Sequence, residues 1–290
     1  MVVGIPEVTQ SSIRTALSTL GPGRPVILVV ASNDYSELFD NWLCHMDVLG
    51  IERILVIAMD EALGARLAAS RWPVARGFFD GSAGDFWLQR ARIWAFLADE
   101  GVEFIHSDVD AVWLRNPIPE FAAVACDLMF SQGTIHPTDV ASQWRFVLCT
   151  GFFWARASPP ARALLGSLAR SVTEILASDD QASLNRHLMA AGTSWATDAV
   201  SSYMMDHQGH TFMAFREAVT GMCQSLELKL VLLPHHLFPR LQPGAENAMV
   251  RHVLRTGDKT ARIDLMRAAG CWRLDAHPRG FAIMPGLQSP

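Results

Sequence analysis

The chain lacks the features that membrane spans, nucleic-acid binders and secreted proteins require. Unbroken apolar runs such as residues 26–31 and 121–126 are far shorter than the roughly 20 residues that cross a bilayer. The net charge is −5, so no basic field is available to bind phosphate backbones. The N-terminus has no basic segment ahead of an apolar stretch, as a secretory signal has. We therefore expect a cytoplasmic protein without a membrane span that binds no nucleic acid.

Cysteine pairs and linkers are also missing. The five cysteines are far apart and form no Cys-x-x-Cys pair, so we predict reduced thiols that act as small buried hydrophobic residues. The chain contains no repeat, low-complexity tract or Pro/Ser-rich linker, while its 50% hydrophobic content suffices for a large core. We expect a single domain over residues 25–290, preceded by a loose N-terminal arm over residues 1–24 that ends in Gly21-Pro22-Gly23.

The first hundred residues alternate between strand and helix patterns. Residues 26–31 and 54–58 are continuously apolar, which is typical of parallel strands buried on both faces. Between them, apolar side chains at helical spacing predict a helix that ends at Gly50. Residues 86–99 predict a further helix, and 103–105 a short strand. The pattern predicts an α/β fold with a mixed, mainly parallel sheet flanked by helices, which binds ligands at the carboxyl ends of its strands.

Two aspartates, Asp108 and Asp110, follow the strand at 103–105. Carboxylates this close repel each other unless a cation lies beside them. Mn²⁺ or Mg²⁺ can be held by one or two carboxylates while it bridges the oxygens of a nucleotide diphosphate. Because an isolated Asp-x-Asp more often consists of turn and capping residues, the pair alone does not establish a metal site.

The residues around this pair form a longer pattern. Ser-Asp-Val-Asp-x-Val-Trp-Leu-Arg-x-Pro over residues 107–117 resembles the nucleotide-diphospho-sugar transferase family related to plant cell-wall xylosyltransferases. The resemblance extends from residue 25 to 275, in the same order, through four further blocks: residues 41–60, Thr150-Gly151-Phe152, Asp179-Asp180-Gln181, and His252 with Gly257 and Lys259. It implies a GT-A fold, a divalent metal, a UDP-sugar donor and a transfer that retains the anomeric configuration.

The resemblance also implies roles for individual residues. Asp108, Asp110 and His252 would bind the metal. Lys259 would place its ammonium on the departing diphosphate, and Arg92 would face the donor. The full set of residues expected to contact the donor is Ser32, Asn33, Asp34, Asp60, Arg92, Asp108, Gly151 and Lys259.

Asp180 and Gln181 have two interpretations. The resemblance makes them candidate catalytic residues. Ser178-Asp179-Asp180-Gln181 also reads as a capping box, in which Ser178 and Gln181 satisfy the first backbone groups of a helix. Both can hold together, because a helix start that points into a cleft holds a carboxylate or amide rigidly against a sugar.

The chain departs from the family at two places. Cys149 stands where the family usually has Asn, and residues 193–225 match no family block. The acceptor, whether a small molecule, a glycan or a protein, is therefore not predicted. One alternative is a sugar-phosphate nucleotidyltransferase, but residues 32–37 lack the Gly-rich phosphate loop that it needs. The other is a degenerate member that binds a sugar nucleotide without turnover.

Overall fold

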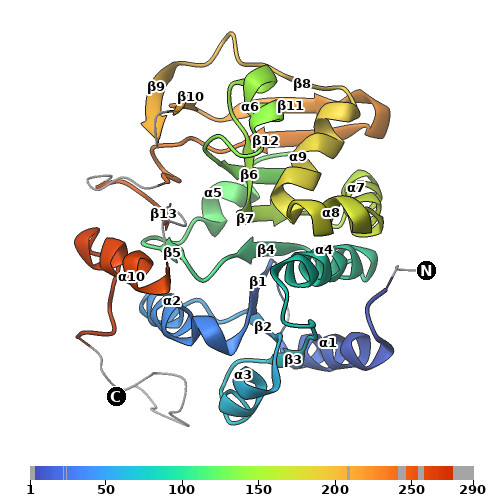
Figure 1. Cartoon of the computed structure of the whole chain (residues 1–290), viewed down its shortest axis with the longest axis vertical. Helices are drawn as coiled ribbons and strands as arrows, with labels where there is room; N and C mark the ends of the chain where they lie inside the picture. The colour runs from blue at the N-terminus through green and yellow to red at the C-terminus, as the bar shows by residue number, and fades with distance from the viewer. Residues whose placement is uncertain are drawn as a thin grey trace.

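The computed structural model describes residues 4–21, 23, 25–207, 210–240, 246–253 and 258–276. Its main feature is a nine-stranded sheet with the strand order β3-β2-β1-β4-β7-β6-β12-β11-β8 (Figure 1). The strands of this sheet are β1 (Val26–Ala31), β2 (Ile54–Ala58), β3 (Val74–Arg76), β4 (Phe104–Ser107), β6 (Leu128–Gln132), β7 (Leu148–Ala155), β8 (Thr193–Trp195), β11 (Val219–Cys223) and β12 (Leu228–Leu232). Two short pairs lie outside it: β5 (Ala111–Trp113) with β13 (Val250–His252), and β9 (Ser202–His207) with β10 (His210–Phe215).

The sheet is parallel where the sequence predicts it to be. Strands β3, β2, β1 and β4 run in parallel, so the carboxyl ends of β1 and β4 meet at one edge. β7 lies antiparallel between β4 and β6, which joins this half to the remaining strands. The predicted strands at 26–31 and 54–58 coincide with β1 and β2, so the mixed α/β fold is confirmed.

Helices flank the sheet (Figure 1). They are α1 (Glu7–Thr19), α2 (Ser36–Val48), α3 (Glu61–Arg66), α4 (Ala83–Asp99), α5 (Ile118–Ala122), α6 (Thr138–Trp144), α7 (Pro159–Arg170), α8 (Val172–Ala177), α9 (Asp180–Ala190) and α10 (Lys259–Ala268). Gly50 has φ +63°, a left-handed conformation that favours glycine, and it follows the end of α2 as predicted. Within the described part of the chain, no helix is long and apolar enough to cross a membrane.

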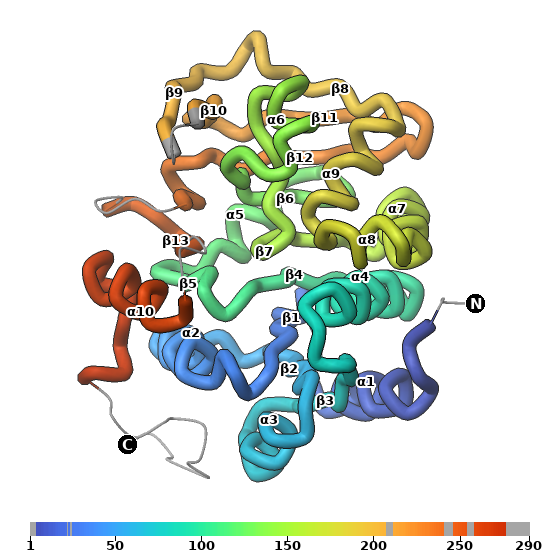
Figure 2. The backbone as a smooth tube through the Cα atoms, viewed as in Figure 1, coloured from blue at the N-terminus to red at the C-terminus, as the bar shows by residue number. Residues whose placement is uncertain are grey.

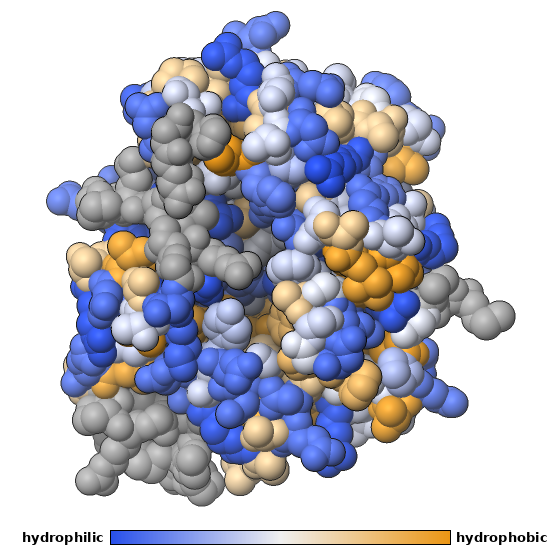
Figure 3. Space-filling view, viewed as in Figure 1, coloured by the Kyte–Doolittle hydropathy of each residue, from blue (hydrophilic) through white to orange (hydrophobic). Residues whose placement is uncertain are grey.

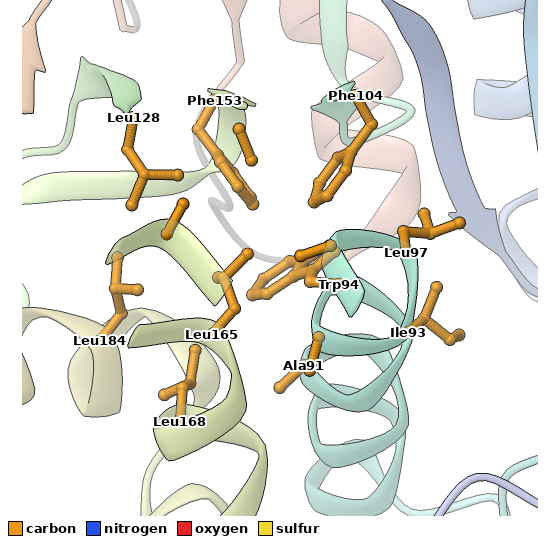
Figure 4. Close-up of a cluster of buried hydrophobic side chains, with 14 of the residues drawn as sticks. Ala91, Ile93, Trp94, Leu97, Phe104, Leu128, Phe153, Leu165, Leu168 and Leu184 are labelled. Carbon is orange, nitrogen blue, oxygen red and sulfur yellow. The ribbon is translucent and has the colours of Figure 1, made fainter. Parts of the chain in front are cut away.

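Two hydrophobic clusters form the core, one on each face of the sheet. Along β1, Val26, Leu28 and Val30 belong to one cluster, and the residues between them belong to the other, because successive strand side chains point to opposite faces. In the first cluster, the Trp94 ring of α4 lies 5.0 Å from the Phe153 ring of β7 (Figure 4). This packing fixes α4 against the strands that carry the candidate site.

The N-terminal segment differs from the predicted loose arm. Residues 7–19 form α1, which packs beside the edge strand β3 (Figure 2). Ile13 and Ala16, spaced three apart on one helical face, are buried in the core, and Ser12 Oγ accepts a hydrogen bond from the Arg76 backbone N–H at 2.9 Å. α1 therefore covers a sheet edge that would otherwise expose unpaired backbone groups.

The C-terminal part of the described chain returns to α2 (Figure 2). Asn41 Nδ2 donates to the Cys271 carbonyl at 3.0 Å, and the Arg273 backbone N–H donates to Asn41 Oδ1 at 2.7 Å. This return places β13 and α10 beside the carboxyl ends of β1 and β4, although they follow β4 by about 150 residues and β1 by about 220 residues in sequence.

Candidate active site

A cavity of about 430 Å³ opens at the carboxyl ends of the parallel strands. The face of the molecule in Figure 3 is hollowed near its centre. Polar walls come from the ends of β1 and β4, from β7, and from the start of α9, while Phe79, Phe86 and Trp87 form an aromatic wall. Of the predicted site residues, those that line this cavity are Ser32, Asp34, Asp108, Asp110, Gly151, Asp180, Gln181 and His252.

Asp108, Asp110 and His252 form the centre of the cavity. Each offers one ligand atom, and these atoms lie within 4.8 Å of one another. His252 Nε2 is 3.2 Å from Asp110 Oδ1 and 3.9 Å from Asp108 Oδ2. Asp110 and His252 are buried, while Asp108 keeps 25% of its side chain exposed toward the cavity. Two carboxylates and one imidazole suit a hard or borderline divalent ion, so these residues fit the expected metal.

Local structure explains how residues 142 apart in sequence converge. After β4, the Ala111 N–H donates to the Asp108 carbonyl at 3.0 Å and closes a tight turn, which directs both aspartates into the cavity. Strand β5 then pairs antiparallel with β13, so that Ala111 lies opposite His252. Ser107 Oγ accepts hydrogen bonds from Trp42 and Trp113, both at 3.1 Å, which anchors the strand end in the core.

Gly151 is required because other groups approach its backbone closely. Its carbonyl accepts the Asp108 N–H at 2.7 Å. A Cβ at this position would collide with the His252 ring and the Asp108 carboxylate. The glycine of the Thr-Gly block thus permits Asp108, Asp110 and His252, the candidate metal-ligand trio, to assemble.

Arg90 connects the two acidic motifs. Its Nε and Nη2 donate to Asp180 Oδ2 and Oδ1 at 2.6 and 2.8 Å, and its Nη1 donates to Asp108 Oδ1 at 2.7 Å. Thr150 Oγ1 also donates to Asp180, at 3.2 Å. Arg90 and Asp180 are 7% and 1% exposed, so this is a buried ion pair with both carboxylate oxygens engaged.

Arg90, and not Arg92, lies on the face of α4 that lines the cavity. Ala83, Phe86 and Trp87 line the cavity at helical spacing with Arg90. Arg92 lies two residues further along, on another face of the helix, where its guanidinium packs against Gly4. The prediction for Arg92 is therefore wrong by about half a helical turn.

The α9 start differs from the predicted capping box. The cap is Asp179, whose Oδ1 accepts from the Ala182 N–H at 2.6 Å. Among the described residues the buried Ser178 Oγ has no hydrogen-bond partner, so the predicted Ser178 cap is wrong. Gln181 lines the cavity, and its Nε2 donates to the His136 carbonyl at 2.7 Å instead of returning to the cap. An extended backbone at Asp179 turns the first residue of α9 inward, which buries Asp180.

Lys259 lies at the surface. Its Nζ pairs with Glu37 Oε2 at 2.9 Å, and it does not line the cavity. Arg262, one turn later on α10, enters the site instead: its Nη1 donates to Asp110 Oδ2 at 2.9 Å, and its guanidinium lies 5.5 Å from the centre of the Tyr35 ring. Gly257 of the same block lies outside the described residues.

Asp60 and Asn33 hold the turn that follows β1 next to the start of α3. Asp60 caps α3 by accepting the Leu63 N–H at 2.8 Å, and its other oxygen accepts the Asn33 backbone N–H at 2.6 Å. Neither residue lines the cavity, in contrast to the prediction that both contact the donor. Asp60 thereby holds the turn that presents Ser32, Asp34 and Tyr35.

Cys149 and Arg240 are site residues that the sequence did not reveal. Cys149 Sγ lies 3.4 Å from His252 Nδ1, and Arg240 Nη1 donates to the same sulfur. All five cysteines are buried and unpaired as predicted, but Cys149 has charged neighbours instead of an apolar environment. The departure from Asn at this position was the one signal that could have pointed to it.

Neighbouring charged side chains shift the pKa values of Asp108, His252 and Cys149. Burial favours neutral Asp108, but Arg90 and His106 outweigh it and hold the pKa of Asp108 below its usual range. Burial and Arg240 oppose the charged form of His252, but Cys149 and Asp110 raise its pKa to about 9. Burial favours the Cys149 thiol, yet Arg240 and His252 lower its pKa to about 7. Such shifts are typical of functional sites.

Known proteins resemble the chain in sequence and in fold. A beta-arabinofuranosyltransferase of Arabidopsis thaliana is 26% identical over 163 residues, which cover 51% of this chain and 30% of that protein. An arabinosyltransferase of the same plant is 28% identical over 177 residues, covering 53% and 26%. The chain thus spans less than a third of either relative. The apo structure of the WbbM bifunctional glycosyltransferase matches with TM-score 0.52 at 9% identity, over 89% of this chain and 52% of that chain.

These similarities agree with the arrangement of the site. The structural match shows a GT-A glycosyltransferase fold. In this chain Asp108 and Asp110 follow β4, a central strand of the sheet. The model of the family described as nucleotide-diphospho-sugar transferase matches residues 49–261, which include the trio, the Thr-Gly block and α9. The chain belongs to the nucleotide-diphospho-sugar transferase family.

Proposed function

We propose that the chain acts as one GT-A domain, with α1 as part of it, that transfers a sugar from a UDP-sugar to an acceptor, with Mn²⁺ or Mg²⁺ and with retention at the anomeric carbon. The observation that carries this proposal is the convergence of Asp108, Asp110 and His252 in a cavity of a family member. Asp108 Oδ2 and Asp110 Oδ1 face His252 Nε2, and these three atoms would hold the ion. When bound, the ion would act as a Lewis acid toward the diphosphate leaving group.

Arg240 and Arg262 provide the positive charge that the sequence predicts for Lys259. Both are buried, both line the cavity, and the Nε of each has no partner among the described residues. A guanidinium presents its donors as a rigid fork that matches the geometry of phosphate oxygens. Charge developing on the departing nucleoside diphosphate is stabilised by such fixed donors, which lowers the barrier to breaking the glycosidic bond.

The remaining walls divide between nucleoside and sugar. Ser32, Asp34 and Tyr35 at the end of β1 offer polar groups and a ring face to the nucleoside. Phe86, Trp87 and Gln181 line the cavity together with Arg90, from α4 and α9, and we assign the transferred sugar to this part of the lining. Aromatic faces pack against the apolar faces of sugars, while the amide and guanidinium donate to hydroxyl groups.

The Arg90–Asp180 pair favours a front-face route to retention. A double displacement needs a carboxylate free to attack the anomeric carbon. Both oxygens of Asp180 accept hydrogen bonds from Arg90, so attack by Asp180 would require breaking a buried ion pair. Asp180 therefore positions Arg90, and Gln181 contacts the donor sugar. The acceptor attacks from the side on which the diphosphate leaves.

The experiment measures turnover of a donor panel with Mn²⁺. Because the two relatives named above are arabinosyltransferases, UDP-arabinose belongs in the panel beside UDP-hexoses. Release of UDP by hydrolysis or transfer supports the proposal. Pyrophosphate exchange would instead indicate a nucleotidyltransferase, and binding without turnover would indicate a degenerate member; either result contradicts the proposal. Nuclear magnetic resonance of the product anomer then tests retention.

A further inference from the structure

Cys149 contacts the side of His252 that faces away from the metal-ligand trio. Its sulfur lies 3.4 Å from Nδ1, while Nε2 faces Asp110 and Asp108 at 3.2 and 3.9 Å. Cys149 is 1% exposed and His252 is 5% exposed, so water is excluded from the contact. The ring is therefore held between a sulfur at one nitrogen and two carboxylates at the other.

The chemistry of a ligating histidine assigns a direction to this contact. Coordination through Nε2 requires the lone pair of that nitrogen, so Nδ1 must carry the proton. A proton on buried Nδ1 needs an acceptor, and Cys149 Sγ is the partner that the structure gives it. In many metal sites a carboxylate or a backbone carbonyl fills this position and fixes the ring.

Arg240 makes the sulfur an acceptor. A guanidinium can only donate, so its hydrogen bond from Nη1 directs a sulfur lone pair toward Arg240. Arg240 is also buried, and its backbone pairs with His252 in an isolated bridge. The sulfur cannot itself join a metal held at Nε2, because the two ring nitrogens point in diverging directions.

We propose that Cys149 is a positioning residue: oriented by Arg240, its sulfur accepts the Nδ1–H of His252 and turns Nε2 toward Asp108 and Asp110. The inference rests on the metal site of the proposed function and deepens it. It gives a physical role to the one residue at which the Thr-Gly block departs from the family. A buried cysteine that only fills space would have no effect on metal affinity.

The test compares Mn²⁺ binding by calorimetry in the wild type and in Cys149→Ala, Cys149→Ser and Cys149→Asn. Loss of an outer partner of a ligating histidine costs about 10- to 100-fold in metal affinity. We expect Cys149→Ala to lose at least tenfold, and Cys149→Ser and Cys149→Asn, which keep an acceptor oxygen, to remain within a few-fold of wild type. Melting temperatures in EDTA check that all four proteins fold alike.

A metal-free readout separates the possible failures. Nitrogen-15 spectra of the His252 ring are recorded for the wild type and for Cys149→Ala at a pH at which the ring is neutral. The wild type should show the proton on Nδ1, and Cys149→Ala should show a mixture of the two neutral tautomers. Equal Mn²⁺ affinity and equal spectra in wild type and Cys149→Ala would overturn the inference and leave the proposed function intact. A wild type that binds no Mn²⁺ would overturn the metal assignment and the inference with it.

Discussion

Arg90 holds both carboxylate oxygens of Asp180, through Nε at 2.6 Å and Nη2 at 2.8 Å. The third nitrogen of the same guanidinium binds Asp108. One buried arginine thus links the start of α9 to the turn that follows β4. Arg90 therefore helps to hold Asp108, one member of the candidate metal-ligand trio, in place.

Asp180→Asn should destabilise the protein strongly. Removing one partner of a buried ion pair costs up to roughly 3–5 kcal/mol of the free energy of unfolding, and here Arg90 would keep only Asp108 to balance its buried charge. The matched control is Asp139→Asn, because Arg186 binds Asp139 through the same atoms but at the surface. That exposed pair is worth at most about 1 kcal/mol. Urea titration of both variants measures the difference, and equal losses would show that Asp180 has no special structural role.

Asp179→Ala and Ser178→Ala distinguish the observed cap from the predicted one. Loss of the Asp179 cap should cost about 0.5–2 kcal/mol of unfolding free energy. Ser178→Ala removes a buried hydroxyl for which the described part of the chain offers no partner, so it should cost less than Asp179→Ala or stabilise the protein. Thermal or urea unfolding measures both. If Ser178→Ala lost more unfolding free energy than Asp179→Ala, Ser178 would be the cap, as the predicted capping box has it.

Arg262→Gln and Lys259→Gln test which basic residue of α10 binds the donor. Arg262 is buried beside Asp110, whereas Lys259 pairs with Glu37 at the surface. We expect Arg262→Gln to weaken UDP binding at least tenfold in Mn²⁺, about 1.4 kcal/mol, and Lys259→Gln to leave it within twofold. Calorimetry measures both affinities. A larger loss of UDP affinity in Lys259→Gln than in Arg262→Gln would instead assign diphosphate binding to Lys259, as the sequence predicts.

Buried His45 should make the fold sensitive to acid. Its Nε2 hydrogen-bonds the Cys271 carbonyl and its Nδ1 accepts from Arg273 Nε, an arrangement of the neutral ring. Burial lowers the pKa of His45 from 6.5 to about 4. The unfolded chain therefore binds more protons in this window, and stability is lost as pH falls from about 6.5 toward 4.

The variant His45→Gln isolates this contribution. Between pH 7 and pH 5 the wild type should lose roughly 2 kcal/mol of unfolding free energy through this residue, about 1.4 per pH unit below 6.5. His45→Gln should lose correspondingly less over the same range. Urea titrations at the two pH values measure the losses. Parallel losses in both proteins would assign the acid sensitivity to other groups, such as buried His235, whose pKa burial also lowers to about 4.

Elements set by local pattern were predictable from the sequence. β1 and β2 are continuous apolar runs, and α2 has an apolar stripe and a glycine end, so their positions follow from residue order alone. The trio was predictable because family blocks mark all three members. α1 was missed because its buried face is narrow: Thr9, Ile13 and Ala16 give a weak apolar pattern, which only packing against β3 makes decisive.

Side-chain direction explains most of the errors in the site. Arg90 and Arg92 are two residues apart, and only the observed phase of α4 decides which one enters the cavity. Arg262 and Lys259 differ in the same way on α10. Arg240 reaches the site through a bridge to His252 that no local motif indicates. In each case, contacts between segments far apart in sequence decide which side chain enters the cavity, and the local sequence pattern does not reveal those contacts.

Calorimetric titration of UDP into wild type and Asp110→Asn, each in Mn²⁺ and in EDTA, tests the central claim most directly. In the proposed site Asp110 would bind the ion through Oδ1, which faces His252, while its Oδ2 accepts from Arg262. An amide keeps the shape of the side chain without its charge. The account predicts that wild type binds UDP at least tenfold more tightly in Mn²⁺ than in EDTA, and that Asp110→Asn, folded by circular dichroism, loses this difference. Equal UDP affinity in Mn²⁺ and EDTA for the wild type, or an undiminished difference in Asp110→Asn, would contradict it.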